Sequence, residues 1–146
     1  MNIEKAKELL SYHSGYNENF ESLKWTNGFL GQLRPYKGRL YENNFFELVE
    51  ILKALQPEFQ NSDKIDRDIV AMLFAIVTVP RLWAFDPQGM LRSNNLISKS
   101  DLNQLNDWLI RLSEGIEYLL NSADDIDCIM TGYGEEIPDY FEWKER

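Results

Sequence analysis

Few residues in this chain could support nucleophilic or transition-metal chemistry. It contains one histidine, His13, and one cysteine, Cys128. A zinc helix with two histidines and an iron site with two histidine ligands both need more imidazoles than the chain has. A disulfide within the chain is excluded as well, which is typical of a reducing compartment.

The sequence around His13 and Cys128 indicates packing rather than catalysis. His13 stands at the end of an amphipathic stretch, residues 3–12, and we interpret it as a packed or capping residue rather than a catalytic base. Cys128 follows three aspartates in residues 124–127, whose negative charge disfavours a thiolate. Its neighbours are apolar, so we predict that Cys128 is a small buried hydrophobe.

Two short patterns are similar to cofactor loops but depart from them at decisive positions. Asp125 and Asp127 alternate as at the start of a calcium loop, but Ile129 replaces the third ligand and Met130 replaces the turn glycine. The segment 132–134, Gly-Tyr-Gly, lacks the third glycine of a dinucleotide fingerprint and the Gly-Lys-Ser/Thr of a phosphate loop. We interpret it as a mobile turn, and we expect no cofactor.

Carboxylates supply the one remaining route to catalysis. Glu47 and Glu50 share a helix face and, with the aspartates of 124–127, could hold a divalent cation. An enzyme that depends on carboxylates and a divalent metal is therefore an alternative function. Exposed polar positions on an amphipathic helix explain the two glutamates more simply, so we predict no metal site and no catalytic residues.

The charge of the chain favours some partners over others. The formal net charge is −9, which disfavours binding to the phosphate backbone of nucleic acids. Residues 123–146 contain eight acids and two bases, so this segment carries −6 of the total. We expect a basic protein as the partner, while a solvated acidic tail that only aids solubility is the alternative.

Aromatic residues are interleaved with the acids of this C-terminal segment. Aromatic side chains act as buried anchors in protein interfaces, and acids steer a basic partner toward them. The alternative is that the aromatic residues fold back over the helices. The predicted partner-binding residues are Tyr133, Glu135, Glu136, Asp139, Tyr140, Phe141, Glu142 and Trp143.

A second candidate surface is the long connection at residues 79–96. It combines large apolar side chains with two arginines and two adjacent asparagines, and long loops in compact domains are often functional. The alternative, which we favour, is that Trp83 anchors residues 81–97 onto the core. The secondary candidates are Arg81, Trp83, Arg92, Asn94 and Asn95.

Apolar residues at helical spacing predict the elements that position these residues. We expect a first helix at residues 3–12, short helical pieces in 16–36, and a helix at 41–55 that Pro57 closes. Asp63 is the expected N-cap of the next helix. That helix, residues 65–79, has little polar face, so we expect it to be the central, most buried one.

The last predicted helix has the clearest pattern. Leucines and isoleucines recur at alternating spacings of three and four over residues 102–120, and Ser98 with Asp101 forms a start similar to a capping box. Gly115 lies within this helix and predicts close packing with a neighbour. The pattern ends after Asn121, and Asp86 to Gly89 give a turn signal in the preceding connection.

The sequence therefore predicts an all-α, single-domain bundle of about five helices over residues 1–146, with an irregular acidic, aromatic tail at 123–146. The N-terminal residues have an acid at position 4 and no apolar stretch behind it, which indicates no secretory signal. The longest apolar run, residues 69–79, is too short to span a bilayer. We expect a cytoplasmic protein without a membrane partner.

In its size, acidity and helical character, the chain resembles small bacterial immunity and antitoxin proteins. The resemblance implies an inhibitor that binds a basic protein, and it assigns no individual residue. The leading hypothesis is therefore a non-enzymatic binding or regulatory protein. The metal-dependent enzyme and a self-associating structural subunit, for instance a homodimer, are the alternatives.

Overall fold

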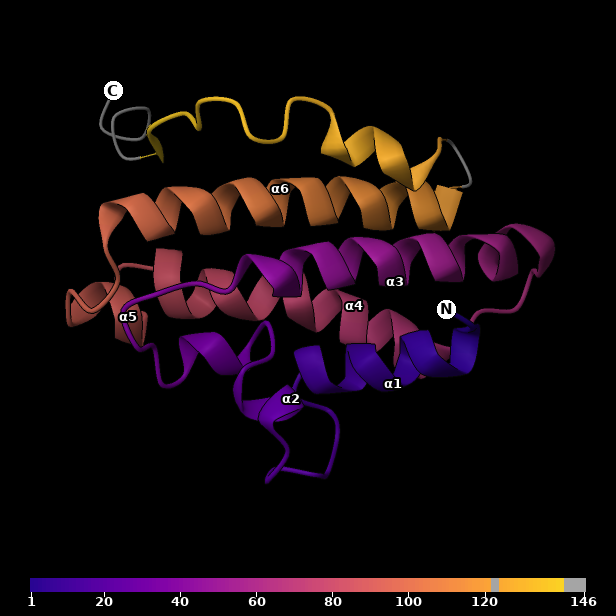
Figure 1. Cartoon of the computed structure of the whole chain (residues 1–146), viewed down its shortest axis with the longest axis horizontal. Coiled ribbons are helices and arrows are strands. Elements are labelled where there is room, and N and C mark those ends of the chain that lie inside the picture. Colours follow the sequence, from indigo (N-terminus) through magenta and orange to yellow (C-terminus); the bar gives the residue numbers. More distant parts are fainter. Residues whose placement is uncertain (122–123, 141–146) are drawn as a thin grey trace.

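The structure, a computed structural model, describes residues 1–121 and 124–140, and within them it is all-α. Four long helices, α1, α3, α4 and α6, form a single bundle, with shorter helical pieces at the connections (Figure 1). The predicted fold class is confirmed. The buried core is one cluster that draws side chains from all four long helices.

Helix α1 (Ile3–His13) begins where the sequence predicts. The side chain of Asn2 accepts a hydrogen bond from the Lys5 backbone N–H at 2.8 Å, which satisfies one of the free donors at the helix start. The helix ends at His13, and Gly15 follows with a φ of +75° that favours glycine. The chain can therefore reverse direction directly after the helix.

The residues after α1 form short helical pieces, as predicted. They are α2 (Leu23–Thr26) and the 3-10 turn η1 (Gly31–Leu33). Gly31 is required for their packing, because a Cβ atom there would lie 2.2 Å from the carbonyl oxygen of Trp25. The peptide bond between Arg34 and Pro35 is cis.

Helix α3 (Glu42–Asn61) is longer than predicted, because Pro57 does not close it. Proline removes one backbone N–H from the helix and is tolerated when packing offsets this loss. Phe59, two residues further on, is buried in the core. Its burial stabilises the helical turn that follows Pro57. The prediction that Pro57 ends this helix was wrong.

Helix α4 (Arg67–Pro80) differs from the prediction at its start and in its burial. Its N-cap is Asp66, whose side chain accepts hydrogen bonds from the backbone N–H groups of Asp68 and Ile69, so the assignment of Asp63 was wrong. The helix is also not the central one. Phe74 is 68% exposed, and Ile65 is exposed before the helix begins.

The centre of the bundle is α3, which packs along both α1 and α6 (Figure 1). Helix α4 packs against α1 and α6 and leaves its outer face open. After Pro80 the chain continues as a π-helical turn, η2 (Arg81–Phe85), and the short α5 (Met90–Ser93). The connection at 81–97 is thus largely helical, with the predicted turn at Asp86 to Gly89.

Helix α6 (Lys99–Asn121) confirms the clearest sequence pattern. The hydroxyl of Ser98 accepts a hydrogen bond from the backbone N–H of Asp101 at 3.1 Å, as a cap would. A Cβ atom at Gly115 would lie 2.9 Å from Leu52 Cδ1 and 3.2 Å from Ile129 Cδ1. The predicted close packing at Gly115 is therefore present.

The described part of the C-terminal segment, residues 124–140, contains a short helical turn that the sequence did not predict. Residues Ile126–Met130 form a 3-10 helix, η3, that buries Ile126 and Ile129 against the bundle. The same turn places Cys128 on the exposed side, so the prediction of a buried Cys128 was wrong. A 3-10 helix repeats every three residues, which explains why residues 126 and 129 share the inner face.

One helical stretch of the described residues, Arg67–Ser93, is long and apolar enough to cross a membrane when judged by length and composition alone. In this fold 44% of its most apolar window is buried, and a core helix of a soluble protein passes the same test. The expected cytoplasmic localisation stays a prediction.

Candidate partner-binding site

The acidic C-terminal segment lies along α6 as a strap. From η3, near the C-terminal end of α6, residues 131–140 run back toward the N-terminal end of the same helix (Figure 1). We call residues 124–140 the strap. The predicted site residues in the strap are therefore positioned by contacts with α6, α3 and η2.

The first part of the strap is fixed to α3. Gln56 donates a hydrogen bond from Nε2 to the carbonyl of Asp124 at 2.8 Å. Lys53 forms an ion pair with Asp127 at 3.1 Å between Nζ and Oδ1. Because Ile126 is also fully buried, this end of the strap is held by both apolar and polar contacts.

Tyr133 is the central anchor of the strap. Its ring stacks on Phe45, with the ring centres 5.2 Å apart. Its hydroxyl donates to Glu42 Oε2 at 2.6 Å and accepts from Trp108 Nε1 at 3.2 Å. Burial and the hydrogen bond to the Glu42 carboxylate together raise the pKa of Tyr133 to about 12. The predicted partner-binding residue Tyr133 thus also holds the strap on α3 and α6.

Arg111 of α6 lies beside this anchor, and its Nε and one terminal nitrogen already donate hydrogen bonds within the fold. Its Nε donates to Asp107 Oδ2 at 2.9 Å, and one terminal nitrogen donates to the carbonyls of Ile129 and Thr131 at 2.6 and 2.9 Å. The guanidinium also lies over the ring of Tyr133, 5.3 Å from its centre. Arg111 therefore neutralises Asp107 and fixes the strap backbone.

The far end of the strap is fixed to the start of α6 and to η2. Asp139 forms an ion pair with Lys99 at 2.8 Å, and the backbone N–H of Tyr140 donates to Asn103 Oδ1 at 2.8 Å. The ring of Tyr140 meets that of Phe85 edge to face, with centres 5.2 Å apart. The two segments that the sequence singled out therefore meet here.

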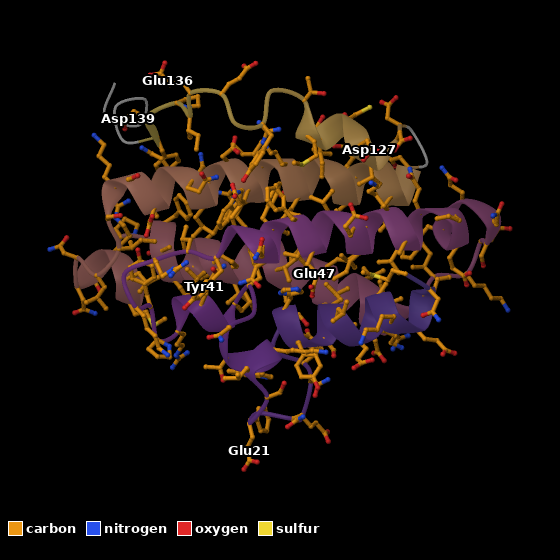
Figure 2. All side chains as sticks on the ribbon, viewed as in Figure 1. Glu21, Tyr41, Glu47, Asp127, Glu136 and Asp139 are labelled. Atoms are coloured by element: carbon orange, nitrogen blue, oxygen red, sulfur yellow. The ribbon has the colours of Figure 1, made fainter. Side chains whose placement is uncertain are left out.

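Between α6, the start of α3 and the strap lies an acidic cleft with a volume of about 500 Å³. Its charged lining consists of four carboxylates and the one engaged guanidinium. Glu135 and Glu136 are exposed, and neither forms an ion pair with another described residue. Figure 2 shows Glu136 at the outer edge of the molecule, above α6. The lining that matters here is Glu42, Asp107, Arg111, Tyr133, Glu135 and Glu136.

A second cleft, of about 490 Å³, lies on the other side of the strap. Ile110 of α6 contributes an exposed apolar side chain to it, and Arg81, Asp139 and Tyr140 line it as well. Arg81 donates to Asn106 Oδ1 at 3.4 Å and lies over the ring of Phe85. One secondary candidate, Arg81, is thus brought next to the strap.

The other secondary candidates lie elsewhere. The Trp83 ring is partly buried against the core and lines a separate cleft on the α1 side, as its predicted anchoring role requires. Arg92 is half-buried in α5. Asn94 donates from Nδ2 to the carbonyl of Met90 and ends α5, and Asn95 follows with a positive φ of 52°. The last three predicted partner-binding residues, Phe141, Glu142 and Trp143, lie outside the described residues.

The two glutamates proposed for a metal site, Glu47 and Glu50, bind side chains of the fold instead. Glu47 lies between α3 and α1 (Figure 2), and its Oε1 is 3.0 Å from Nε2 of the buried His13. This hydrogen bond lowers the pKa of Glu47. The other ring nitrogen of His13 accepts from the backbone N–H of Phe29, so His13 is the packed residue that the sequence indicates. Glu50 pairs with Lys53.

Within residues 1–121 and 124–140, no cluster of three or more histidine, cysteine or acidic residues is arranged to hold a metal ion. The acidic cleft itself contains residues that the sequence reasoning missed, namely Glu42, Asp107 and Arg111. Each sits at an ordinary polar position of an amphipathic helix. Only the return of the strap along α6 makes them part of a site, and no local pattern encodes that return.

Comparison of the chain with known protein families, with curated proteins and with solved structures gave no match.

Proposed function

We propose that this chain is a non-enzymatic binding protein whose acidic cleft receives a basic surface of a partner protein. In this proposal it acts as an inhibitor or regulator of that partner, in the manner of immunity and antitoxin proteins. The protein is cytoplasmic, needs no cofactor, and takes neither nucleic acid nor a membrane as its partner.

The observation that carries the proposal is the uncompensated charge of the cleft. Four carboxylates line it, whereas its single guanidinium, on Arg111, is already bound by Asp107 and by two backbone carbonyls. A lysine or arginine of a partner would supply the counter-charge for Glu135 and Glu136. Because Glu135 and Glu136 are exposed, salt screens their attraction, which therefore acts mainly on the rate of encounter.

The strap gives this cleft a fixed shape before any partner arrives. It is held at Asp127, at Tyr133 and at Asp139, which lie at its beginning, middle and end. A site that is ordered in advance loses little conformational freedom on binding, so more of the interaction energy goes into affinity. Ile137 and Pro138 line both clefts and offer apolar contact beside the charges.

The proposal is tested by capturing partners from native lysate on immobilised wild-type protein and on the double variant Glu135→Gln, Glu136→Gln. We expect the wild type to retain a basic protein that mass spectrometry identifies. The double variant should retain at least about tenfold less of it, because two of the cleft charges are gone.

The matched control is the double variant Glu58→Gln, Glu117→Gln. Both glutamates are exposed, and neither lines a cleft of the strap. This variant loses the same net charge and should capture as much partner as the wild type. Equal losses in the two double variants would show that net charge, and not the cleft, attracts the partner.

A further inference from the structure

A third cleft, of about 410 Å³, lies on the side of the bundle away from the strap, among α1, the short pieces after it and η2. In Figure 1 the strap runs along one edge of the bundle, above α6, and α1 and α2 lie along the opposite edge. The side chains that line the cleft are mainly apolar or aromatic: Tyr12, Trp25, Leu30, Arg34, Val79 and Trp83.

The fold ties the walls of this cleft together. The backbone N–H of Leu30 donates to the carbonyl of His13 at 3.0 Å, and that of Phe29 donates to His13 Nδ1 at 3.0 Å. Gly28 permits this close approach to α1, because a Cβ atom there would lie 3.1 Å from the carbonyl oxygen of Tyr12 and 2.7 Å from that of Lys24. The cleft is therefore a built feature of the α1 end and not a gap between mobile loops.

Two cations stand over its aromatic walls. The Arg34 guanidinium lies 5.6 Å from the ring centre of Trp83, and the Lys24 ammonium lies 5.9 Å from that of Tyr12. Arg34 is exposed and forms no ion pair with a described residue. A guanidinium near an indole ring is attracted to it by a cation–π interaction, and its N–H donors stay available for a carboxylate.

The local charge is opposite to that of the whole protein. Among the described residues that line the cleft, Arg34 alone is charged, whereas the chain carries a net charge of −9. No acid lines this cleft, whereas four acids line the cleft beside the strap. The two clefts therefore favour ligands of opposite charge.

We propose that this cleft binds a small planar aromatic carboxylate. The aromatic ring packs against Trp25, Trp83 and Tyr12, and the carboxylate accepts hydrogen bonds from the Arg34 guanidinium at the mouth. Arginine matches a carboxylate with two parallel donors, and stacked rings favour a flat apolar body. The volume lies within the range of small-molecule sites.

The indole N–H of Trp25 has no hydrogen-bond partner among the described residues, and its nitrogen is fully covered. A ligand oxygen could reach it only after the ring turns, so we assign the anion to Arg34. The indole proton of Trp25 still reports on the cleft, because a ring packed against the side chain would change its magnetic environment.

The test uses 2-naphthoate and its neutral counterpart 2-naphthamide, titrated into the full chain and followed by two-dimensional NMR. We expect 2-naphthoate to shift the indole signals of Trp25 and Trp83, with a Kd of about 1 mM or tighter. The amide has the same ring without the charge and should bind at least about tenfold more weakly.

Arg34→Gln should raise the Kd for 2-naphthoate by about tenfold, while Arg67→Gln, an exposed arginine at the start of α4, should leave it within about twofold. A backbone N–H spectrum that matches that of the wild type confirms that each variant is folded. Equal binding of acid and amide to the wild type overturns the proposal, and so does an Arg34→Gln variant with wild-type affinity. Absence of binding at about 5 mM does the same.

Discussion

The hydroxyl of Tyr133 donates a 2.6 Å hydrogen bond to the Glu42 carboxylate, which joins the strap to the first turn of α3 across 91 positions of sequence. The same hydroxyl accepts from the buried indole of Trp108 in α6. One side chain thus links three elements and sets one wall of the acidic cleft. Its loss should be measurable in both stability and binding.

Tyr133→Phe should lower the free energy of unfolding by about 1–3 kcal/mol. The ring stacking is kept, but the Trp108 N–H, in a residue that is 1% exposed, loses its acceptor. Urea denaturation measures the change. Tyr16→Phe is the control, because Tyr16 is 54% exposed and should change stability little. Similar small effects in both variants would contradict the anchoring role of Tyr133.

The start of α4 gives a paired prediction. Asp66→Ala should cost about 1 kcal/mol, because the Asp66 side chain accepts two backbone hydrogen bonds at the helix start. Asp63→Ala should cost less than about 0.5 kcal/mol, because Asp63 is exposed and caps nothing. Thermal unfolding of both variants shows which aspartate caps α4. A larger loss of stability in Asp63→Ala than in Asp66→Ala would contradict the structure.

The same aspartate should make stability depend on pH. The hydrogen bond from Lys7 lowers the pKa of Asp66 below its ordinary value of 3.8. A carboxyl with a lowered pKa stabilises the fold fully above its unfolded value, and this contribution is lost as the pH falls through the lowered pKa. Unfolding measured between pH 6 and pH 2 should therefore show a smaller acid-induced loss in Asp66→Asn than in the wild type. Parallel curves would count against the pairing.

Two neighbouring residues test which face of α4 is buried. Leu73 is 1% exposed, so Leu73→Ala should cost about 2–5 kcal/mol. Phe74 is 68% exposed, and Phe74→Ala should cost less than about 0.5 kcal/mol although it removes more atoms. Chemical denaturation gives both values. A greater loss at Phe74 would show that the helix is rotated from its described position.

Local patterns predicted the parts of the fold that local physics controls. The cap at Ser98 and the stripe of α6 depend on residues within a few positions of one another. The close packing at Gly115 is against Leu52 and Ile129 of other elements, and the missing side chain of glycine indicated it. The choice of Asp63 over Asp66 as the N-cap of α4 was wrong within a local pattern, whereas the wrong end of α3 depends on distant contacts. Pro57 stays inside α3 because Phe59 is buried in the core. The sequence near Pro57 does not show which distant residues Phe59 will pack against.

The candidate site could be predicted only in part, for the same reason. The acids and aromatic residues of the strap are visible in composition, so the sequence names Glu135, Glu136 and Tyr133 as candidates. The sequence does not show which helices these side chains face, because that depends on where the strap returns along α6. Glu42 and Asp107 join the site through that return alone, and an apolar pattern such as that around Cys128 does not show which side of a 3-10 turn faces the core.

The central claim is that the acidic cleft steers and binds a basic partner, and the rate of association with the captured partner tests it most directly. We expect the wild-type rate to fall steeply as salt rises from about 20 to 500 mM, because long-range attraction is screened. Glu135→Gln with Glu136→Gln should slow association at low salt and flatten this dependence, whereas Glu58→Gln with Glu117→Gln should not. Identical salt dependence in the two double variants would contradict the account. So would full affinity for the partner in a chain that ends at Met130.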